Sequence, residues 1–197
     1  HDPTLRLTKT TGIAYVPDAT HDDWGIKALA ALPDTDTVAY LQRYLGAAAT
    51  GERDRGGPIL FQQGDGANGK TTVMETVMHA LGEYAVQLPD KLLGGQGNEH
   101  DTQWMTLQGA RLACVEELPE GHQLPVAKIK KLADTSTITG RLIGRDYVTF
   151  PATHSLIVNT NYRPRVTETD HGTWRRNVMI EYGHTFSGPT KDNTLKR

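Results

Sequence analysis

The sequence predicts an α/β fold with a mostly parallel sheet, preceded by a small helical segment at the N-terminus. Short apolar runs that suit buried strands alternate with stretches in which apolar residues recur every three or four positions. One such alternation surrounds residues 64–71, which fit the G-x-x-x-x-G-K-[ST] phosphate-binding loop at every fixed position. Because ligands of parallel α/β sheets bind at the carboxyl ends of the strands, we expect a nucleotide site at that edge.

Composition narrows the class of protein. The 197 residues suffice for one full domain and a small second one. We expect the division in the turn-rich stretch 50–58, which gives a mainly helical segment at 1–52 and an ATPase-type domain at 53–197. No apolar run reaches about 18 residues, so no membrane span is expected. The single cysteine, Cys114, excludes an internal disulfide and fits a reducing cytoplasm, and its apolar neighbours predict a buried, inert thiol.

The segment 1–52 carries three element signals. A short β-like run lies at 13–16, and a helical stretch runs near 23–31. A second helix is predicted to open at an Asp34/Thr35 cap and to end at Gly46.

The glycine-rich loop is flanked as phosphate chemistry requires. An apolar run at 59–61 predicts a buried strand before it, and Val73, Val77 and Leu81 predict a helix after it, with Gly82 as the stop signal. Glycines let backbone N–H groups approach phosphates, and the helix N-terminus favours an anion. The residues expected to contact ATP are Gly64, Asp65, Gly66, Ala67, Asn68, Gly69, Lys70, Thr71 and Thr72. Lys70 would contact the β- and γ-phosphates and Thr71 would ligate Mg²⁺.

Two acids follow the next predicted strand, at 111–115. One carboxylate at this place can orient the metal and the other can polarise the attacking water, and we assign these roles to Glu116 and Glu117 respectively. A strand that ends in solvated acids is the purely structural alternative.

Two more polar groups come later in the chain. A buried strand at 155–158 is followed by Asn161, which could hydrogen-bond the attacking water or the γ-phosphate, although an ordinary Asn/Thr turn would look the same. Arg175 and Arg176, before a fourth strand at 178–180, could stabilise charge on a transferring phosphoryl group, often from a neighbouring subunit. Between these motifs, the sequence predicts a helix near 125–133 and a hairpin over 137–150 that turns near 144–146.

The order of these motifs resembles a superfamily III helicase. The resemblance is closer to the helicase domain of phage and plasmid primase–helicases, the group that includes the poxvirus-type enzymes. It runs from about residue 24 to residue 182, and it includes the stretches 81–84, 109–112, 138–141 and 174–176 in addition to the loop and the acids.

This resemblance implies an AAA+-like P-loop core that assembles into a ring, with a hexamer expected. Mg-ATP would lie between subunits, and either Arg175 or Arg176 would face the neighbour's nucleotide. The hairpin would point into the central channel and track single-stranded DNA. The DNA contacts would be Lys130, Lys131, Arg141 and Arg145. Such a local cluster reconciles DNA binding with a net charge of −2, because phosphate contacts need only local cations.

The leading interpretation is therefore an ATP-dependent replicative DNA helicase of the phage or plasmid type. A primase domain is expected in the same full-length chain or in a partner. The protein would act in the cytoplasm, of a bacterial host if a phage or plasmid encodes it. Two alternatives stay open: a P-loop small-molecule kinase, and a non-hydrolysing module in which ATP switches DNA loading or assembly.

Overall fold

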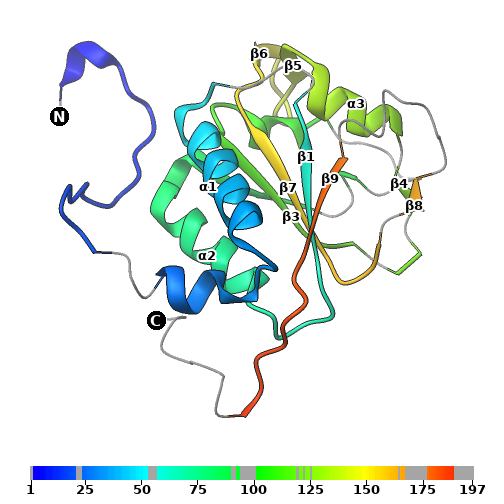
Figure 1. Ribbon diagram of the computed structural model, residues 1–197. Helices are drawn as coiled ribbons and strands as arrows, with labels where there is room; N and C mark the ends of the chain where they lie inside the picture. Colours follow the sequence, from blue (N-terminus) through cyan, green and yellow to red (C-terminus); the bar gives the residue numbers. More distant parts are fainter. Residues whose placement is uncertain are drawn as a thin grey trace.

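The chain folds around one five-stranded sheet in which every strand pairing is parallel. The computed structural model describes residues 2–20, 24–52, 57–89, 92–93, 101–118, 120–121, 123–124, 126–163, 165–166 and 177–188. The strand order is β2-β3-β7-β1-β9. The strands are β1 (Ile59–Gln63), β2 (Ala85–Leu88), β3 (Leu112–Leu118), β7 (Ser155–Thr160) and β9 (Asn177–Glu181). The expected α/β class with a mostly parallel sheet is confirmed (Figure 1).

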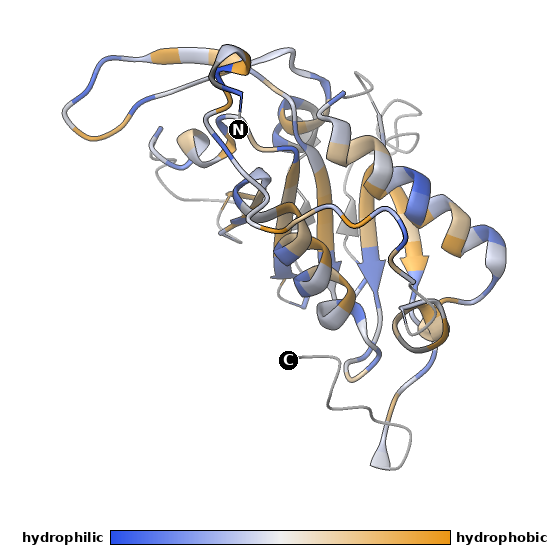
Figure 2. Cartoon of the chain, turned by 90° about the vertical axis from the view of Figure 1, so that its left-hand side faces the viewer, coloured by the Kyte–Doolittle hydropathy of each residue, from blue (hydrophilic) through white to orange (hydrophobic). Residues whose placement is uncertain are grey.

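Helices cover both faces of this sheet. They are α1 (Thr35–Thr50), α2 (Lys70–Leu81) and α3 (Val126–Asp134), with a short 3₁₀ turn η6 (Trp104–Leu107). Alternate strand residues serve opposite faces: Leu60 and Ile157 pack with α1 and α2, whereas Phe61 and Val158 pack with η6 and α3. Burial on both faces explains why these strands are continuous apolar runs in the sequence. Figure 2 shows hydrophobic residues concentrated in the strands, between the helical layers.

The hairpin forms as predicted, as an antiparallel pair of β5 (Thr137–Gly140) and β6 (Val148–Pro151). A second minor pair joins β4 (Gln123–Leu124) to β8 (Arg165–Val166) in parallel. The prediction for α2 is also confirmed, since the helix ends at Leu81 and Gly82 caps it. Strand β2 is not among the predicted elements, and its four residues include a glutamine.

Helix α1 begins where predicted but runs farther. The Asp34 side chain accepts a hydrogen bond of 2.7 Å from the Thr37 backbone N–H, so the N-cap is confirmed. The predicted end at Gly46 is wrong: the helix continues to Thr50 and stops at Gly51, whose φ of 74° is the left-handed C-cap conformation. One interior glycine costs only about 1 kcal/mol relative to alanine, and burial of the last turn through Ala48 offsets that cost.

The first thirty residues depart most from expectation. The predicted β-like run at 13–16 forms no strand. The helical stretch is a π turn (Trp24–Ala28) followed by a 3₁₀ turn (Leu29–Ala31), while position 23 lies outside the described residues. Thr10 anchors this part of the chain, since its N–H donates to Glu83 Oε2 at 2.8 Å and its carbonyl accepts from Glu83 N–H at 3.1 Å.

The proposed division at 50–58 stays a prediction, because residues 53–56 lie outside the described part of the chain. Leu41 and Ala48 of α1 belong to the same apolar cluster as Leu60 of β1 and Val73 of α2. Helix α1 therefore shares a core with the sheet. Within the described residues, no helix is both long enough and apolar enough to cross a membrane.

Candidate nucleotide site and DNA hairpin

The glycine-rich loop joins the carboxyl end of β1 to the start of α2. Its backbone is left-handed at Gly66, Ala67 and Gly69, with φ angles of 99°, 47° and 86°. Gly69 is also the N-cap of α2. Backbone N–H groups that follow such conformations form anion-binding concavities, and a helix N-terminus adds a favourable dipole. The loop therefore has the backbone shape that its sequence predicts.

Lys70 connects three of the predicted motifs. Its side chain is buried, with 5% of the residue exposed, and its Nζ donates to the Gly64 carbonyl and, at 3.3 Å, to Asn161 Oδ1. Burial lowers the pKa of Lys70, and the nearby charges of Asp65 and Glu117 partly oppose that shift. The lysine, the asparagine after β7 and the second acid of β3 thus lie together at the carboxyl edge of the sheet.

The acid pair lies near the carboxyl end of β3, as expected of a strand that ends in two acids, although the strand runs to Leu118 rather than to Val115. The register between β3 and β7 shifts between Val115 and Leu118, and Glu117 has a left-handed φ of 52°. This irregularity is a β-bulge, a feature that redirects side chains near functional sites. Glu116 Oε2 accepts a hydrogen bond of 3.2 Å from Gln87 of β2, whereas Glu117 acts electrostatically on Lys70. The two carboxylates therefore have different partners.

Residues that follow β9 also shape the loop, and sequence reasoning missed them. The Asn68 side-chain amide lies 3.5 Å from the Tyr182 carbonyl, and the Phe186 N–H donates to the Ala67 carbonyl at 2.8 Å. A Cβ on Gly64 would lie 2.7 Å from the Tyr182 carbonyl oxygen and would also collide with the Asn68 amide. The requirement for glycine at position 64 is therefore steric. No local signal predicts this clasp, because it joins residues more than 110 positions apart.

The residues present fit a magnesium ion held mainly by phosphate. Thr71 is exposed in the first turn of α2, and Glu116 and Glu117 come from β3. The described residues contain no group of three His, Cys, Asp or Glu side chains that could bind a metal on their own. Mg²⁺ commonly binds through one or two protein ligands together with substrate phosphates and water. Cys114 does not compete as a nucleophile, because burial and the Glu116 charge raise the pKa of its thiol to about 12.

The predicted DNA contacts lie at the opposite edge of the sheet. Strand β6 leads into the amino end of β7, whereas the phosphate loop follows the carboxyl end of β1. The hairpin therefore lies far from the phosphate loop (Figure 1). Arg145 is exposed in the turn, and its side chain makes no hydrogen bond, ion pair or ring contact with the described residues. Lys131, in contrast, lies 4.1 Å from the centre of the Trp104 ring, and Arg141 lies 4.7 Å from that of Tyr147. Two of the four predicted contacts are therefore engaged within the domain.

Three predicted site residues lie wholly or partly outside the described part of the chain. They are Arg175, Arg176 and the side chain of Lys130, whose backbone belongs to α3. Strand β9 begins at Asn177, which pairs with Ile59 at the start of β1. The chain therefore enters β9 at the edge of the sheet opposite the phosphate loop.

A parallel sheet with a lysine-bearing glycine loop at its carboxyl edge defines a P-loop α/β domain. The family described as a family of unknown function, DUF5906, matches residues 62–176, and the chain belongs to this family. The expected resemblance to the helicase domain of primase–helicases is confirmed, since the relatives that follow carry primase and helicase names.

Viral proteins are among its relatives. One is named "Putative primase C962R", from African swine fever virus, with 30% identity over 175 residues that cover 84% of this chain and 18% of the relative. Another is named "Putative helicase L207/L206", from Acanthamoeba polyphaga mimivirus, with 24% identity over 78% of this chain and 16% of the relative. The chain thus spans less than a fifth of these relatives.

Solved structures share the fold. The C-terminal region of NrS-1 superposes with a TM-score of 0.70 at 14% identity, over 94% of this chain and 44% of that one. The JCV helicase superposes with a TM-score of 0.53 at 15% identity, over 87% of this chain and 45% of that one. The expected fold class is confirmed by both.

Proposed function

We propose that this chain is the ATPase core of a replicative DNA helicase. In this proposal, copies of the chain form a ring, hydrolyse Mg-ATP between subunits and move along single-stranded DNA. The observation that carries it is the meeting of Lys70, Asn161 and Glu117 beside the phosphate loop. These residues come from three different elements, and a site for phosphate-bond hydrolysis needs a cation, a polar sensor and a base in one place.

Each of the three groups has a role that follows from its surroundings. Lys70 is a buried cation whose charged form is disfavoured by burial, so a polyphosphate is a strongly favoured partner for it. Asn161 already contacts the lysine ammonium through Oδ1, and its amide N–H groups can donate to a γ-phosphate oxygen or to water. Glu117 is exposed and can accept a proton from the attacking water.

Magnesium would be held by Thr71, by Glu116 and by phosphate oxygens, and it would neutralise charge that develops on the phosphates. Gln87 would then orient Glu116, since its amide donates to this carboxylate. The remaining loop residues, 64–69, would bind phosphate through backbone N–H groups.

The arginine that completes the site would come from the neighbouring subunit. Asn177, the residue directly after Arg176, pairs at the edge of the sheet opposite the phosphate loop. This placement supports action of Arg175 or Arg176 on another copy rather than on their own loop. Arg145 would contact single-stranded DNA from the exposed tip of the hairpin. The proposal also includes a primase domain, in the full-length chain or in a partner, and action in the cytoplasm, of a bacterial host if a phage or plasmid encodes the chain.

The direct test is the rate of ATP hydrolysis with and without single-stranded DNA, in the wild-type chain and in Lys70→Ala. Wild-type turnover should rise with DNA, and the variant should lose turnover by at least about a hundredfold while its circular dichroism stays unchanged. The loss is expected because the alanine removes the only cation described in the loop.

Two results would contradict the proposal. Unchanged turnover in Lys70→Ala would remove the phosphate-loop assignment. Turnover indifferent to DNA, at a concentration where light scattering shows a ring, would favour a kinase or an assembly switch. A phosphorylated acceptor would identify the former.

A further inference from the structure

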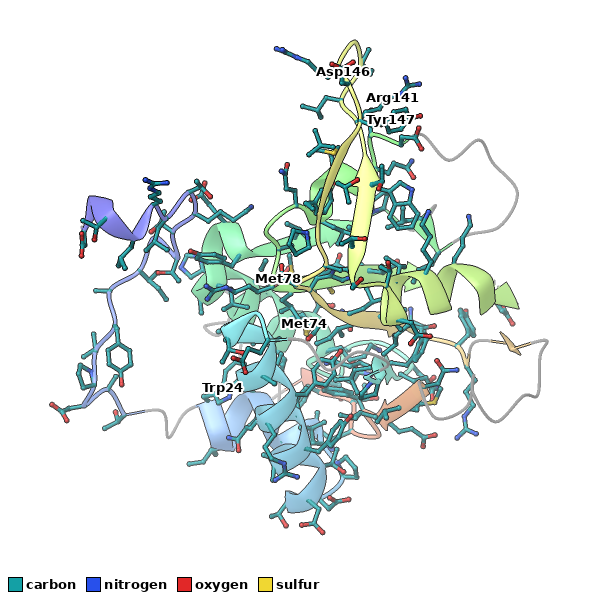
Figure 3. The ribbon with its side chains drawn as sticks, turned by 90° about the horizontal axis from the view of Figure 1, so that it is seen from above. Trp24, Met74, Met78, Arg141, Asp146 and Tyr147 are labelled. Atoms are coloured by element: carbon teal, nitrogen blue, oxygen red, sulfur yellow. The ribbon has the colours of Figure 1, made fainter. Side chains whose placement is uncertain are left out.

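The neck of the hairpin holds three side chains that the nucleotide site does not use. The β5–β6 ladder ends at the pair of Gly140 and Val148, and Arg141 and Tyr147 are the next residues on the two strands. Tyr147 Oη donates to Asp101 Oδ2 at 2.6 Å, and Arg141 Nε lies 3.8 Å from the same oxygen. One carboxylate therefore holds both sides of the neck. Figure 3 shows Arg141 and Tyr147 together below the tip of the hairpin.

The segment that carries Asp101 is itself fixed to the core. A Cβ on Gly140 would lie 2.8 Å from the Asp101 carbonyl oxygen and 3.2 Å from Trp104 Cβ, so β5 lies directly against this segment. Trp104 is buried, and the ammonium of Lys131 in α3 lies over its ring. The neck thus packs against the segment of η6, and η6 in turn contacts α3.

Beyond the neck, the hairpin has little support of its own. Residues 141–149 are all exposed, and Ile143 is 93% exposed. In the tip, the Arg145 N–H donates to the Leu142 carbonyl at 3.0 Å, which closes the turn. A hairpin of two short strands is only marginally stable in water without further packing. The contacts at the neck therefore decide how firmly the tip is held.

We propose that Asp101, Arg141 and Tyr147 form a clamp that fixes the hairpin, so that Arg145 at its tip is presented to single-stranded DNA. This inference rests on the proposed function, and it assigns Arg141 a positioning role in place of the DNA contact expected from the sequence. Asp101 offsets the charge of Arg141 locally, while the Arg145 side chain forms no ion pair or hydrogen bond within the described part of the chain.

Substitution of Asp101 distinguishes the clamp from a purely electrostatic effect, because the two predict opposite changes in DNA affinity. Asp101→Ala removes a negative charge near the hairpin, so charge alone predicts tighter DNA binding. The clamp predicts the opposite, namely that affinity for a fluorescent oligo-dT falls about three- to tenfold. Tyr147→Phe changes no charge and should weaken binding in the same way, and both variants should bind ATP as the wild type does. Asp101→Asn keeps an acceptor for Tyr147 and should retain part of the affinity.

Two further readouts do not depend on DNA. Amide hydrogen exchange in β5 and β6 should be about tenfold faster in Asp101→Ala than in wild type. The hydrogen bond to Asp101 raises the pKa of Tyr147, so its NMR titration should move toward the ordinary tyrosine value in the same variant. Arg145→Ala should weaken DNA binding without changing either readout, and Tyr15→Phe, at an exposed tyrosine in the N-terminal arm, should change nothing.

Tighter oligo-dT binding by Asp101→Ala, or unchanged exchange in β5 and β6, would overturn the clamp. Failure of the wild-type chain to bind oligo-dT would instead contradict the proposed function. In that case the exchange rates still decide whether these three residues hold the hairpin.

Discussion

At the scale of single residues, Glu117 is the most unusual position in the fold. A left-handed φ at a non-glycine residue costs of order 1–3 kcal/mol and tends to persist at functional sites. At Glu117 the strain accompanies a bulge, and its charge partly opposes the lowering of the Lys70 pKa by burial. The sequence identified both acids, but it could not show the bulge, because the strain depends on pairing with β7.

This geometry makes Glu117→Gln a specific test of its role. Glutamine keeps the size and the polarity of the side chain but cannot accept the proton of water as a base. Turnover should fall at least about a hundredfold, with nucleotide affinity within about threefold of wild type in fluorescence titration. Glu120→Gln, at an exposed acid two residues beyond β3, should leave turnover unchanged. Near-normal hydrolysis by Glu117→Gln would exclude it as the base.

At the scale of elements, the spacing of apolar residues predicted the strands and helices whose signals lie within one continuous stretch of sequence. The run β1–loop–α2 follows from its apolar strand, its glycines and its helical spacing, and the structure confirms all three parts. Strand β2 and the end of α1 depend on neighbours that are distant in the sequence. Gly46 was predicted to end α1, but the helix continues because Ala48 in its last turn packs in the apolar core.

Helix α1 tests whether residues 1–52 are independent of the rest. Leu41 is 1% exposed and packs in the cluster that contains Leu60 and Val73, so Leu41→Ala should lower the free energy of unfolding by about 2–5 kcal/mol. Denaturant unfolding should show one cooperative transition for the whole chain.

Gln42→Ala, on the exposed side of the same helix, is the matched control and should change stability by less than about 0.5 kcal/mol. Two separate transitions, of which only one responds to Leu41→Ala, would show that α1 folds as part of its own unit.

At the scale of the whole molecule, a parallel sheet separates its two ends. The phosphate loop lies at the carboxyl edge, while the hairpin and the start of β9 lie at the amino edge. In the proposed ring, one subunit's amino edge must approach the next subunit's phosphate loop. The order of motifs in the sequence predicted this shared site, but no single chain could show it.

A mixing experiment tests the shared site. Lys70→Ala and the double variant Arg175→Ala/Arg176→Ala should each be inactive, because each lacks one half of every site. In equal mixture, about a quarter of the sites in a randomly assembled ring should combine an intact loop with intact arginines. ATP turnover should then return to roughly that fraction of wild type. A mixture as inactive as its components would place the arginines in their own subunit's site, whereas an active double variant would place them outside any site.

The clasp of the phosphate loop by the residues after β9 has a consequence for binding energy. The contacts of Tyr182 and Phe186 with the loop form when the chain folds, so part of the conformational entropy of the cradle is lost before any anion arrives. If the loop binds nucleotide as proposed, its affinity would then depend in part on Tyr182 and Phe186, which lie outside the glycine motif. Loss of these contacts would weaken nucleotide binding while every residue of the glycine motif stays in place.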